Sequence, residues 1–325
     1  MPVLPITIRD FVKKDIDEVI ECAKESFVEE LEIEGFDPEG WRKLVKRRFS
    51  LFGKTLFVFF RLLNREPFKF FVADVDGKAV GTTVVTKLRN IGYIQLVMVH
   101  PHFRRKGIAY ELMRTAIEFI QRRGFAKAIL HVSATNDAAK NLYNKLGFKK
   151  FEDIVYLTAD VDFITGFESS RGVQIREFAK SDTDTVYDII RRSREPNAFN
   201  VYNIQKSDLR SSLWERIISM SKSKRTVAIK DANIVGYSSS SWTSTMEAGR
   251  IRNIDVMSGT ASQKIEEILV KEGVDFIKSS GTKTVLITLP PAREVLIRRL
   301  ENLGFRKRFF TEGMVLEQFA GVAEV

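Results

Sequence analysis

The chain has 325 residues, about twice the usual length of one domain, and it therefore predicts two domains. Lys and Arg outnumber Asp and Glu by 52 to 42, and both halves of the chain share this excess, which favours anionic ligands. Nucleic acid is disfavoured as a partner because the sequence contains no nucleic-acid-binding module or basic arm. The single cysteine, Cys22, and three dispersed histidines exclude an internal disulfide and disfavour a zinc site, so no metal is expected.

The first residues lack the charged and then apolar leader of a secreted protein, so a cytoplasmic location is expected. No run of about 20 apolar residues is present, so the sequence predicts no transmembrane segment. An acidic cluster follows the first predicted helix and comprises Glu29, Glu30, Glu32 and Glu34. It could receive a cationic molecule, although a solvated helix face is the more ordinary interpretation.

The segment from Trp41 to Leu63 alternates basic residues with aromatic and aliphatic ones. Such a pattern is typical of an amphipathic helix, which either packs on a core or lies on an anionic membrane. Its apolar run, Leu56 to Phe60, is far too short to cross a membrane, because a transmembrane helix needs about 20 apolar residues. Both interpretations stay open at this point.

A strand, a basic turn and a helix are predicted between residues 93 and 124. Residues 93–100 are nearly all apolar, and Pro101 ends the strand. Apolar residues then recur at helical spacing, and Gly124 ends the helix. They are Ala109, Leu112, Met113, Ala116, Ile117 and Ile120. The turn between strand and helix reads Arg104-Arg105-Lys106-Gly107-Ile108-Ala109.

This turn is suited to bind a pyrophosphate. The start of a helix offers unpaired N–H groups and partial positive charge, and both stabilise an anion. Gly107 has no side chain that would keep phosphate oxygens away from the main chain, and the preceding basic residues add positive charge. Taken alone, however, so short a motif is more often a solvated loop.

A second motif lies just downstream. Residues 128–133 predict a strand, and residues 136–146 predict a helix with Asn136, Ala139 and Tyr143 on one side. Gly147 is placed to end that helix in the left-handed conformation. Tyr143 is either an ordinary core residue or, facing the end of a bound cofactor, a proton donor to a leaving thiolate. The order of strand, phosphate turn, helix, strand and Tyr-bearing helix is far more specific than either motif alone.

Residues 92–158 resemble the GCN5-related N-acetyltransferase (GNAT) family. The family's pyrophosphate signature, Arg or Gln-x-x-Gly-x-Gly or Ala, is matched by Arg104, Gly107 and Ala109. Its Asn-x-x-Ala-x-x-x-Tyr helix is matched by Asn136, Ala139 and Tyr143. The resemblance implies acetyl-CoA as co-substrate, Tyr143 as general acid to the CoA sulfur, and main-chain groups of the fourth strand on the pantetheine arm. The cofactor-binding residues that it implies are Met98, Val99, Arg104, Arg105, Lys106, Gly107, Ile108, Ala109, Asn136 and Ala139.

The chain departs from many family members at the general base, which is often a Glu on the fourth strand. That stretch here reads Tyr93-Ile94-Gln95-Leu96. Amino-terminal acetyltransferases of the ribosomal-protein-alanine type are similar at this point, with a Tyr on the fourth strand and Leu-His-Val on the fifth. This resemblance implies that Tyr93 and His131 hold a water that takes the amine proton, a role that suits an imidazole near neutral pH. Purely structural roles for both residues stay open.

Residues 92–148 align without a gap to residues 249–305, and the matched positions are glycine or apolar. The segment Ile8-Arg9-Asp10-Phe11 likewise matches Ile175-Arg176-Glu177-Phe178. We therefore expect an α/β (α+β) protein of two tandem GNAT-like domains, 1–166 and 172–325, joined by a linker from Thr165 to Gly172. Each should be a mixed, mainly antiparallel sheet with helices on both faces.

The second repeat keeps the scaffold and lacks the site. Arg104, Gly107 and Ala109 become Ala261, Lys264 and Glu266, while His131, Asn136 and Tyr143 become Thr288, Arg293 and Leu300. Glu266 and Glu267 would place negative charge at the start of the helix, which repels a pyrophosphate. We expect a degenerate domain that no longer binds the cofactor. It could shape the acceptor site, hold the first domain or form a dimer, and the sequence leaves this and the oligomeric state open.

The expected function is transfer of the acetyl group of acetyl-CoA directly to an amine, with a peptide amino terminus favoured. Two alternatives stay open. One is acetylation of a small-molecule amine or a lysine side chain, and the other is a non-enzymatic acyl-CoA-binding sensor or assembly module. The resemblance also adds a third and preferred interpretation of residues 41–63, a cover over the acceptor groove that packs on the second domain.

Overall fold

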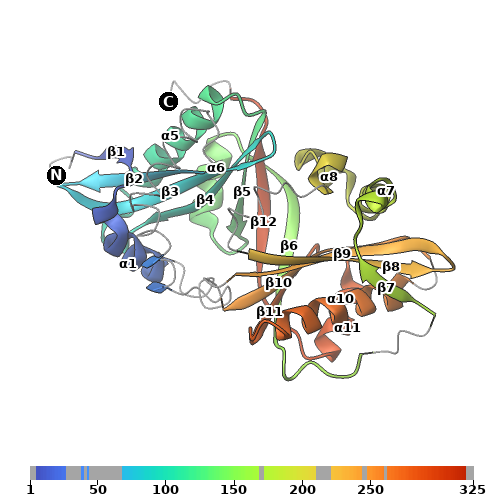
Figure 1. Cartoon of the computed structure of the whole chain (residues 1–325). Helices are drawn as coiled ribbons and strands as arrows, with labels where there is room; N and C mark the ends of the chain where they lie inside the picture. Colours follow the sequence, from blue (N-terminus) through green and yellow to red (C-terminus); the bar gives the residue numbers. More distant parts are fainter. Residues whose placement is uncertain are drawn as a thin grey trace. The chain divides into compact units, whose positions relative to one another are not determined.

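The computed structural model describes residues 5–26, 38–39, 42–43, 68–167, 172–209, 221–243, 247–259 and 262–319 (Figure 1). The acidic cluster at residues 29–34 and nearly all of the segment 41–63 lie outside the described residues, so the expectations for them stay predictions. The chain forms two compact units. Of the described residues, unit 1 contains those up to 151 and 312–319, and unit 2 contains 152–311.

Unit 1 is a mixed, mainly antiparallel sheet in the order β1-β2-β3-β4-β5-β12. Its elements are β1 (Thr7–Asp10), η1 (Lys13–Asp15), α1 (Ile16–Ser26), β2 (Phe68–Val75), β3 (Lys78–Leu88), β4 (Ile91–Val99), η2 (Pro101–Phe103), α5 (Ile108–Arg122), β5 (Lys127–Ser133), α6 (Asp137–Lys145) and the end of β12 (Arg306–Leu316). On β2, Phe71 and Ala73 pack in the core that holds α5, whereas Val72 packs with α1. Because alternate strand residues point to opposite faces, α1 and α5 cover opposite faces of the sheet.

Unit 2 repeats this architecture in the order β7-β8-β9-β10-β11-β6. Its elements are most of β6 (Lys149–Asp160), β7 (Gln174–Glu177), η3 (Lys180–Asp182), α7 (Thr183–Ser193), α8 (Pro196–Val201), η4 (Lys206–Leu209), β8 (Ser221–Lys230), β9 (Asn233–Thr243), β10 (Ala248–Val256), α10 (Ser262–Lys278), β11 (Thr284–Leu289), α11 (Glu294–Asn302) and the start of β12. Neighbouring β8 residues again face opposite cores, Val227 toward α7 and Ala228 toward α10. In the described part of the chain, no helix is long and apolar enough to cross a membrane.

Glycines show that the repeat seen in the sequence is also a repeat of packing. A Cβ on Gly92 would lie 2.4 Å from the side chain of Ile120, and a Cβ on Gly249 would lie 2.5 Å from that of Ile277. Both distances are far below van der Waals contact, so only glycine lets α5 and α10 approach β4 and β10 this closely.

The predicted helix from Ala109 to Ile120 is confirmed as part of α5. Its apolar stripe is buried from Leu112 to Ile120, and Ala109 is half-buried.

Each unit is completed by a strand from the other repeat. Strand β6 is the last strand of the first repeat, yet its Val155 and Leu157 are buried in the core of unit 2, where β6 pairs antiparallel with β11. Conversely, Met314 and Leu316 of β12, at the end of the second repeat, are buried in the core of unit 1. The repeats therefore exchange their last strands. The division into 1–166 and 172–325 follows the repeat and stays a prediction about domains.

Leu316→Ala is expected to destabilise the protein by about 2–5 kcal/mol, because it leaves a cavity in the core of unit 1. Phe310→Ala is the matched control, since Phe310 lies on the same strand with 45% of its surface exposed, and it should cost much less. Urea unfolding of both variants measures the difference. Equal losses would show that β12 does not complete the core of unit 1.

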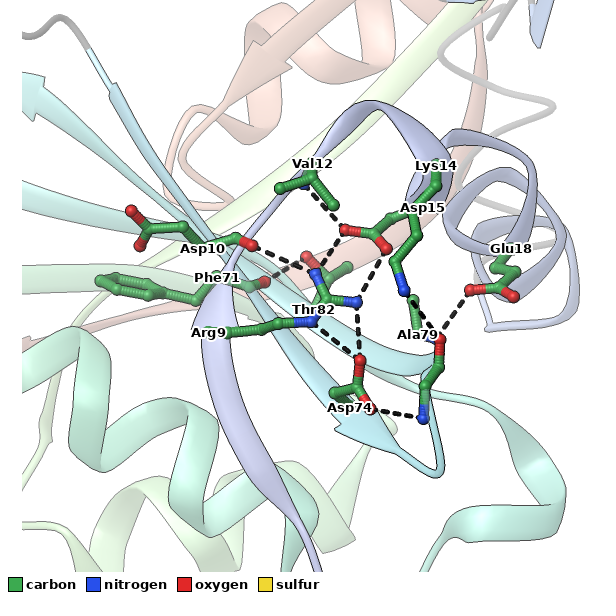
Figure 2. A network of polar contacts seen from close by, with 11 residues as sticks. Arg9, Asp10, Val12, Lys14, Asp15, Glu18, Phe71, Asp74, Ala79 and Thr82 are labelled. Atoms are coloured by element: carbon green, nitrogen blue, oxygen red, sulfur yellow. Dashed lines mark hydrogen bonds and ion pairs between the residues drawn. The ribbon is translucent and has the colours of Figure 1, made fainter.

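A polar network fixes the start of unit 1 (Figure 2). The Arg9 guanidinium donates two hydrogen bonds to the Asp15 carboxylate, at 2.7 and 2.8 Å, and its Nε donates to Asp74 at 2.8 Å. Asp15 also accepts a hydrogen bond from the Val12 amide at 2.8 Å. The network joins β1 to β2 and to the turn before α1. Since Asp15 is fully buried, its charge requires this set of partners.

Unit 2 contains the counterpart of this network. Arg176 donates to both oxygens of Asp182 at 2.6 and 2.9 Å, and the Ala179 amide donates to the same carboxylate at 2.7 Å. The hydrogen bond from Arg176 lowers the pKa of Asp182, although burial of the carboxylate opposes the shift. A lowered pKa means that the folded state favours the charged carboxylate, so Asp182 stabilises the fold above its unfolded pKa of about 3.9.

Asp182→Asn is expected to cost about 1–3 kcal/mol at pH 7, the value of hydrogen bonds to a buried carboxylate whose partner, Arg176, is 43% exposed. The difference from wild type should vanish as the pH falls from 4 through the lowered pKa, because wild type then loses the same interaction. Urea unfolding between pH 7 and pH 3 measures this. Asp184→Asn, which removes an exposed carboxylate paired with Lys206, should have a small effect throughout. A pH-independent loss in Asp182→Asn would contradict the expectation.

Candidate active site in unit 1

A bulge in β4 shapes the centre of the candidate site. Pairing with β3 shifts register between Val84↔Gln95 and Thr82↔Met98, and Leu96 within the bulge has a φ of 51°. The parallel ladder between β4 and β5 runs from Ile91 to Tyr93 on the β4 side and ends there. Among the described residues, the later main-chain groups of β4 therefore have no ladder with β5. Such groups need other hydrogen-bond partners, and a bound molecule can supply them.

The predicted pyrophosphate turn lies directly before α5. Gly107 is the N-cap of this helix, with a φ of 81°, and no side chain caps the first turn. A Cβ on Gly107 would meet no other part of the protein within 4 Å, so the left-handed conformation alone favours glycine here. The space in front of the main chain is open. The turn is exposed from Arg104 to Gly107. Its N–H groups and positive charges fit a diphosphate.

Arg104 has a more specific position than the sequence indicated. Its Nε donates a 3.0 Å hydrogen bond to the main-chain oxygen of Val99, and its Nη2 donates to Ser26 at 3.4 Å. The side chain therefore ties the phosphate turn to the end of β4 and to the end of α1. Lys106 lies over the ring of Phe103, 5.0 Å from its centroid. The apolar β4 sequence gave no signal for the bond between Arg104 and Val99.

Helix α6 holds the predicted Asn136 and Tyr143. The Asn136 side-chain oxygen caps the helix by accepting from the Ala139 amide at 3.1 Å, so its NH₂ group is what it can offer a cofactor. Tyr143 is 6% exposed and packs in the core cluster that also contains Val99 and Ile108. Burial raises the pKa of its phenol well above the usual 10, so the hydroxyl keeps its proton at neutral pH.

Tyr93 and His131 form a direct contact between β4 and β5. The Tyr93 hydroxyl lies 3.1 Å from His131 Nδ1, the rings are nearly perpendicular at 86°, and both residues are half-buried. The ring of Phe151 lies 6.3 Å from that of His131. When Nδ1 donates to the Tyr93 oxygen, the imidazole lone pair is on Nε2, the form required of a base. The contact lies where the β4–β5 ladder ends.

Comparisons with known proteins identify the family and the fold. The model of the Acetyltransferase (GNAT) family matches residues 23–148. An uncharacterised N-acetyltransferase of Methanocaldococcus jannaschii is 30% identical over 45% of this chain, which spans 62% of that relative's length. An acetyltransferase of Sodalis glossinidius is 33% identical over 30% of this chain and 68% of its own. A tandem GNAT protein from the clavulanic acid biosynthesis pathway has the same fold, with a TM-score of 0.62, 14% identity, and coverage of 96% of this chain and 98% of its own.

The chain belongs to the GNAT family of acetyltransferases. The family resemblance and the tandem fold that the sequence indicated are confirmed. Because the chain spans only 62% of the length of the Methanocaldococcus relative, the acetyl-CoA-dependent activity stays a prediction. The structure brings Tyr93 to His131 and Arg104 to Val99, and it packs Tyr143 in one cluster with Val99. The roles of these residues stay predictions.

Gly107→Ala is expected to weaken CoA binding on the order of tenfold or more, because a methyl group would occupy the space of the phosphate oxygens. Gly124→Ala is the matched control at the other end of α5, with a φ of 70° and equally open surroundings. Both substitutions should destabilise the fold by about 1–2 kcal/mol through the left-handed backbone. Calorimetric titration with CoA should separate them. Equal affinities would remove Gly107 from the cofactor site.

Proposed function

We propose that unit 1 is an N-acetyltransferase that transfers the acetyl group of acetyl-CoA directly to an amine, and that the favoured acceptor is a peptide amino terminus. The observation that supports it is the contact between Tyr93 and His131 at the end of the β4–β5 ladder. A protonated amine cannot attack a carbonyl, so the acceptor must first lose a proton. This residue pair offers a base where the acceptor would meet the thioester.

The binding of acetyl-CoA follows from the order of groups along unit 1. The turn ending at Gly107 would hold the diphosphate on the open start of α5. Main-chain groups of Met98 and Val99 would bind the pantetheine arm, since β4 has left its ladder with β5 there. Arg104 supports both parts, because its hydrogen bond to Val99 fixes the end of β4 relative to the turn. The thioester would thereby be directed toward the cluster that contains Tyr143.

The reaction needs a base for the amine and a hydrogen-bond donor for the leaving sulfur. His131, oriented by Tyr93, would remove the amine proton through a water molecule. The neutral amine would then attack the carbonyl carbon, and β4 N–H groups would stabilise the oxyanion. The nitrogen would release its second proton to water as the intermediate collapses. As the carbon–sulfur bond breaks, Tyr143 would donate to the leaving sulfur. A phenol is a weaker acid than a thiol, and burial raises the pKa of Tyr143 further. A strong hydrogen bond to the developing thiolate is therefore its main contribution.

Tyr143→Phe is expected to lower kcat by about 10²- to 10⁴-fold while CoA still binds, since the substitution removes only the donor. Tyr237→Phe is the matched control, because Tyr237 is also a buried phenol with a raised pKa, about 12, but it lies in unit 2. Acetyl-CoA turnover and CoA calorimetry measure the two effects. Wild-type protein that binds CoA without turning over acetyl-CoA on any amine would favour a sensor instead.

The acceptor class is tested with the wild-type chain, acetyl-CoA and a panel of peptides with free or blocked amino termini, with and without lysine, together with small amines. Mass spectrometry of the products locates the acetyl group. Acetylation restricted to free amino termini supports the favoured acceptor. His131→Gln and Tyr93→Phe should each reduce that turnover by about 10²-fold or more. Acetylated lysines or small amines in its place would overturn the acceptor assignment.

A further inference from the structure

Unit 2 contains a bulge in β10 that corresponds to the bulge in β4 of unit 1. Asn253 of β10 occupies the position of Leu96 in the repeat and has the same backbone conformation, with a φ of 55°. Pairing of β10 with β9 shifts register between Arg252 and Asp255, and the parallel ladder of β10 with β11 ends at Ile251. The main chain of β10 after Ile251 therefore needs partners outside the ladder, as it does in β4.

Arg293 supplies such a partner from within the chain. It is the N-cap of α11 and occupies the position of Asn136 in the repeat. Its guanidinium donates to the main-chain oxygen of Ile254 in the β10 bulge and also pairs with the carboxylate of Glu266 on α10. The side chains are 22% and 15% exposed, so the pair is largely withdrawn from water. Glu266 occupies the position of Ala109 in the phosphate turn.

A second arginine holds the same bulge. Arg194, the residue after α7, donates to the two carboxylate oxygens of Asp255 at 3.2 and 3.0 Å and to the side-chain oxygen of Asn253. Ser193 adds a hydrogen bond to Asp255 at 2.7 Å. Asp255 is 3% exposed and occupies the position of Met98. At the aligned positions, Arg293, Glu266 and Asp255 are therefore substitutions specific to the second repeat.

The two units differ in the residues that lie beside the corresponding strands, β4 and β10, beyond the end of their parallel ladders. In unit 1 the residues at these positions are small, apolar or committed to their own helix, since Asn136 caps α6 and Met98 packs on α1. In unit 2 a guanidinium donates to the strand, and Glu266 balances its charge. Burying a charged pair is tolerated only when the pair is well hydrogen-bonded, which Arg293 achieves with one acceptor on each of two elements.

We propose that Arg293 is a built-in occupant of the position that the pantetheine arm would take in unit 1. Unit 2 is then closed by its own side chains, and the chain binds one acyl-CoA. This inference rests on the proposed function, because it compares unit 2 with the cofactor position assigned to unit 1. It explains why α10 accommodates Glu266 at the position of Ala109: the carboxylate that would repel a diphosphate serves as the partner of Arg293.

The test is hydrogen exchange on the full chain with and without CoA, together with calorimetric stoichiometry. In wild type, CoA should protect amides in residues 98–109 and leave residues 254–267 unchanged, with one CoA bound per chain. Arg293→Ala should speed exchange in residues 254–267 at least tenfold without CoA. Arg298→Ala is the matched control, because Arg298 lies on the same helix and pairs only with exposed Glu294 among the described residues; it should leave that exchange unchanged.

Each outcome decides one question. Protection of residues 254–267 by CoA, or two CoA bound per chain, would overturn the inference even if unit 1 is an active acetyltransferase. Absence of protection in residues 98–109 would instead overturn the cofactor position proposed for unit 1. Should Arg293→Ala fail to fold, Glu266→Gln removes only the charge partner and should also speed exchange in residues 254–267. Unchanged exchange in a folded variant would show that Arg293 does not hold the bulge.

Discussion

The separation of β4 from β5 after Tyr93 is the constraint on which the rest of unit 1 depends. A continuous ladder would satisfy every main-chain group of both strands and leave nothing for a ligand. The bulge at Leu96 prevents that, and it does so with a backbone conformation that costs a leucine about 1–2 kcal/mol. The surrounding structure must stabilise this conformation. Arg104 contributes by fixing the carbonyl of Val99 beyond the bulge.

Because the repeats exchange their last strands, the stability of each core depends on residues of both repeats. The core of unit 1 includes Leu316 from the end of the chain, and the core of unit 2 includes Leu157 from the first repeat. Neither repeat can therefore complete its core from its own consecutive residues. A cofactor-free second repeat keeps a structural role under this arrangement, because it carries the strand that closes the core of the first. Loss of its site residues is compatible with retention of its fold.

The sequence predicted the elements whose pattern is local. Helix α5 and the turn at Gly107 could be predicted because apolar spacing and the start of a helix are visible within a few turns of sequence. The repeat could be recognised because glycines recur at matching positions, and close helix packing at Gly92 and Gly249 is the physical reason for them. The exchange of strands was not predicted, since the alternation in β6 suits either sheet equally. The left-handed backbone at Leu96 could not be predicted, because leucine does not mark such a position as glycine or asparagine would. The hydrogen bond from Arg104 to Val99 depends on tertiary structure.

The two bulges illustrate how one backbone feature can serve two purposes. In β10 the left-handed position is occupied by Asn253, a residue type that adopts this conformation more readily than leucine. Arg194 donates to its side chain and Arg293 to the next carbonyl, so in unit 2 the opened strand is held by permanent internal partners. In unit 1 the left-handed position of the bulge is occupied by Leu96, which adopts this conformation less readily. The guanidinium of Arg104 donates to the main-chain oxygen of Val99, beyond the bulge. The opening has therefore been kept in both units, and in the proposed function it receives an external ligand in unit 1.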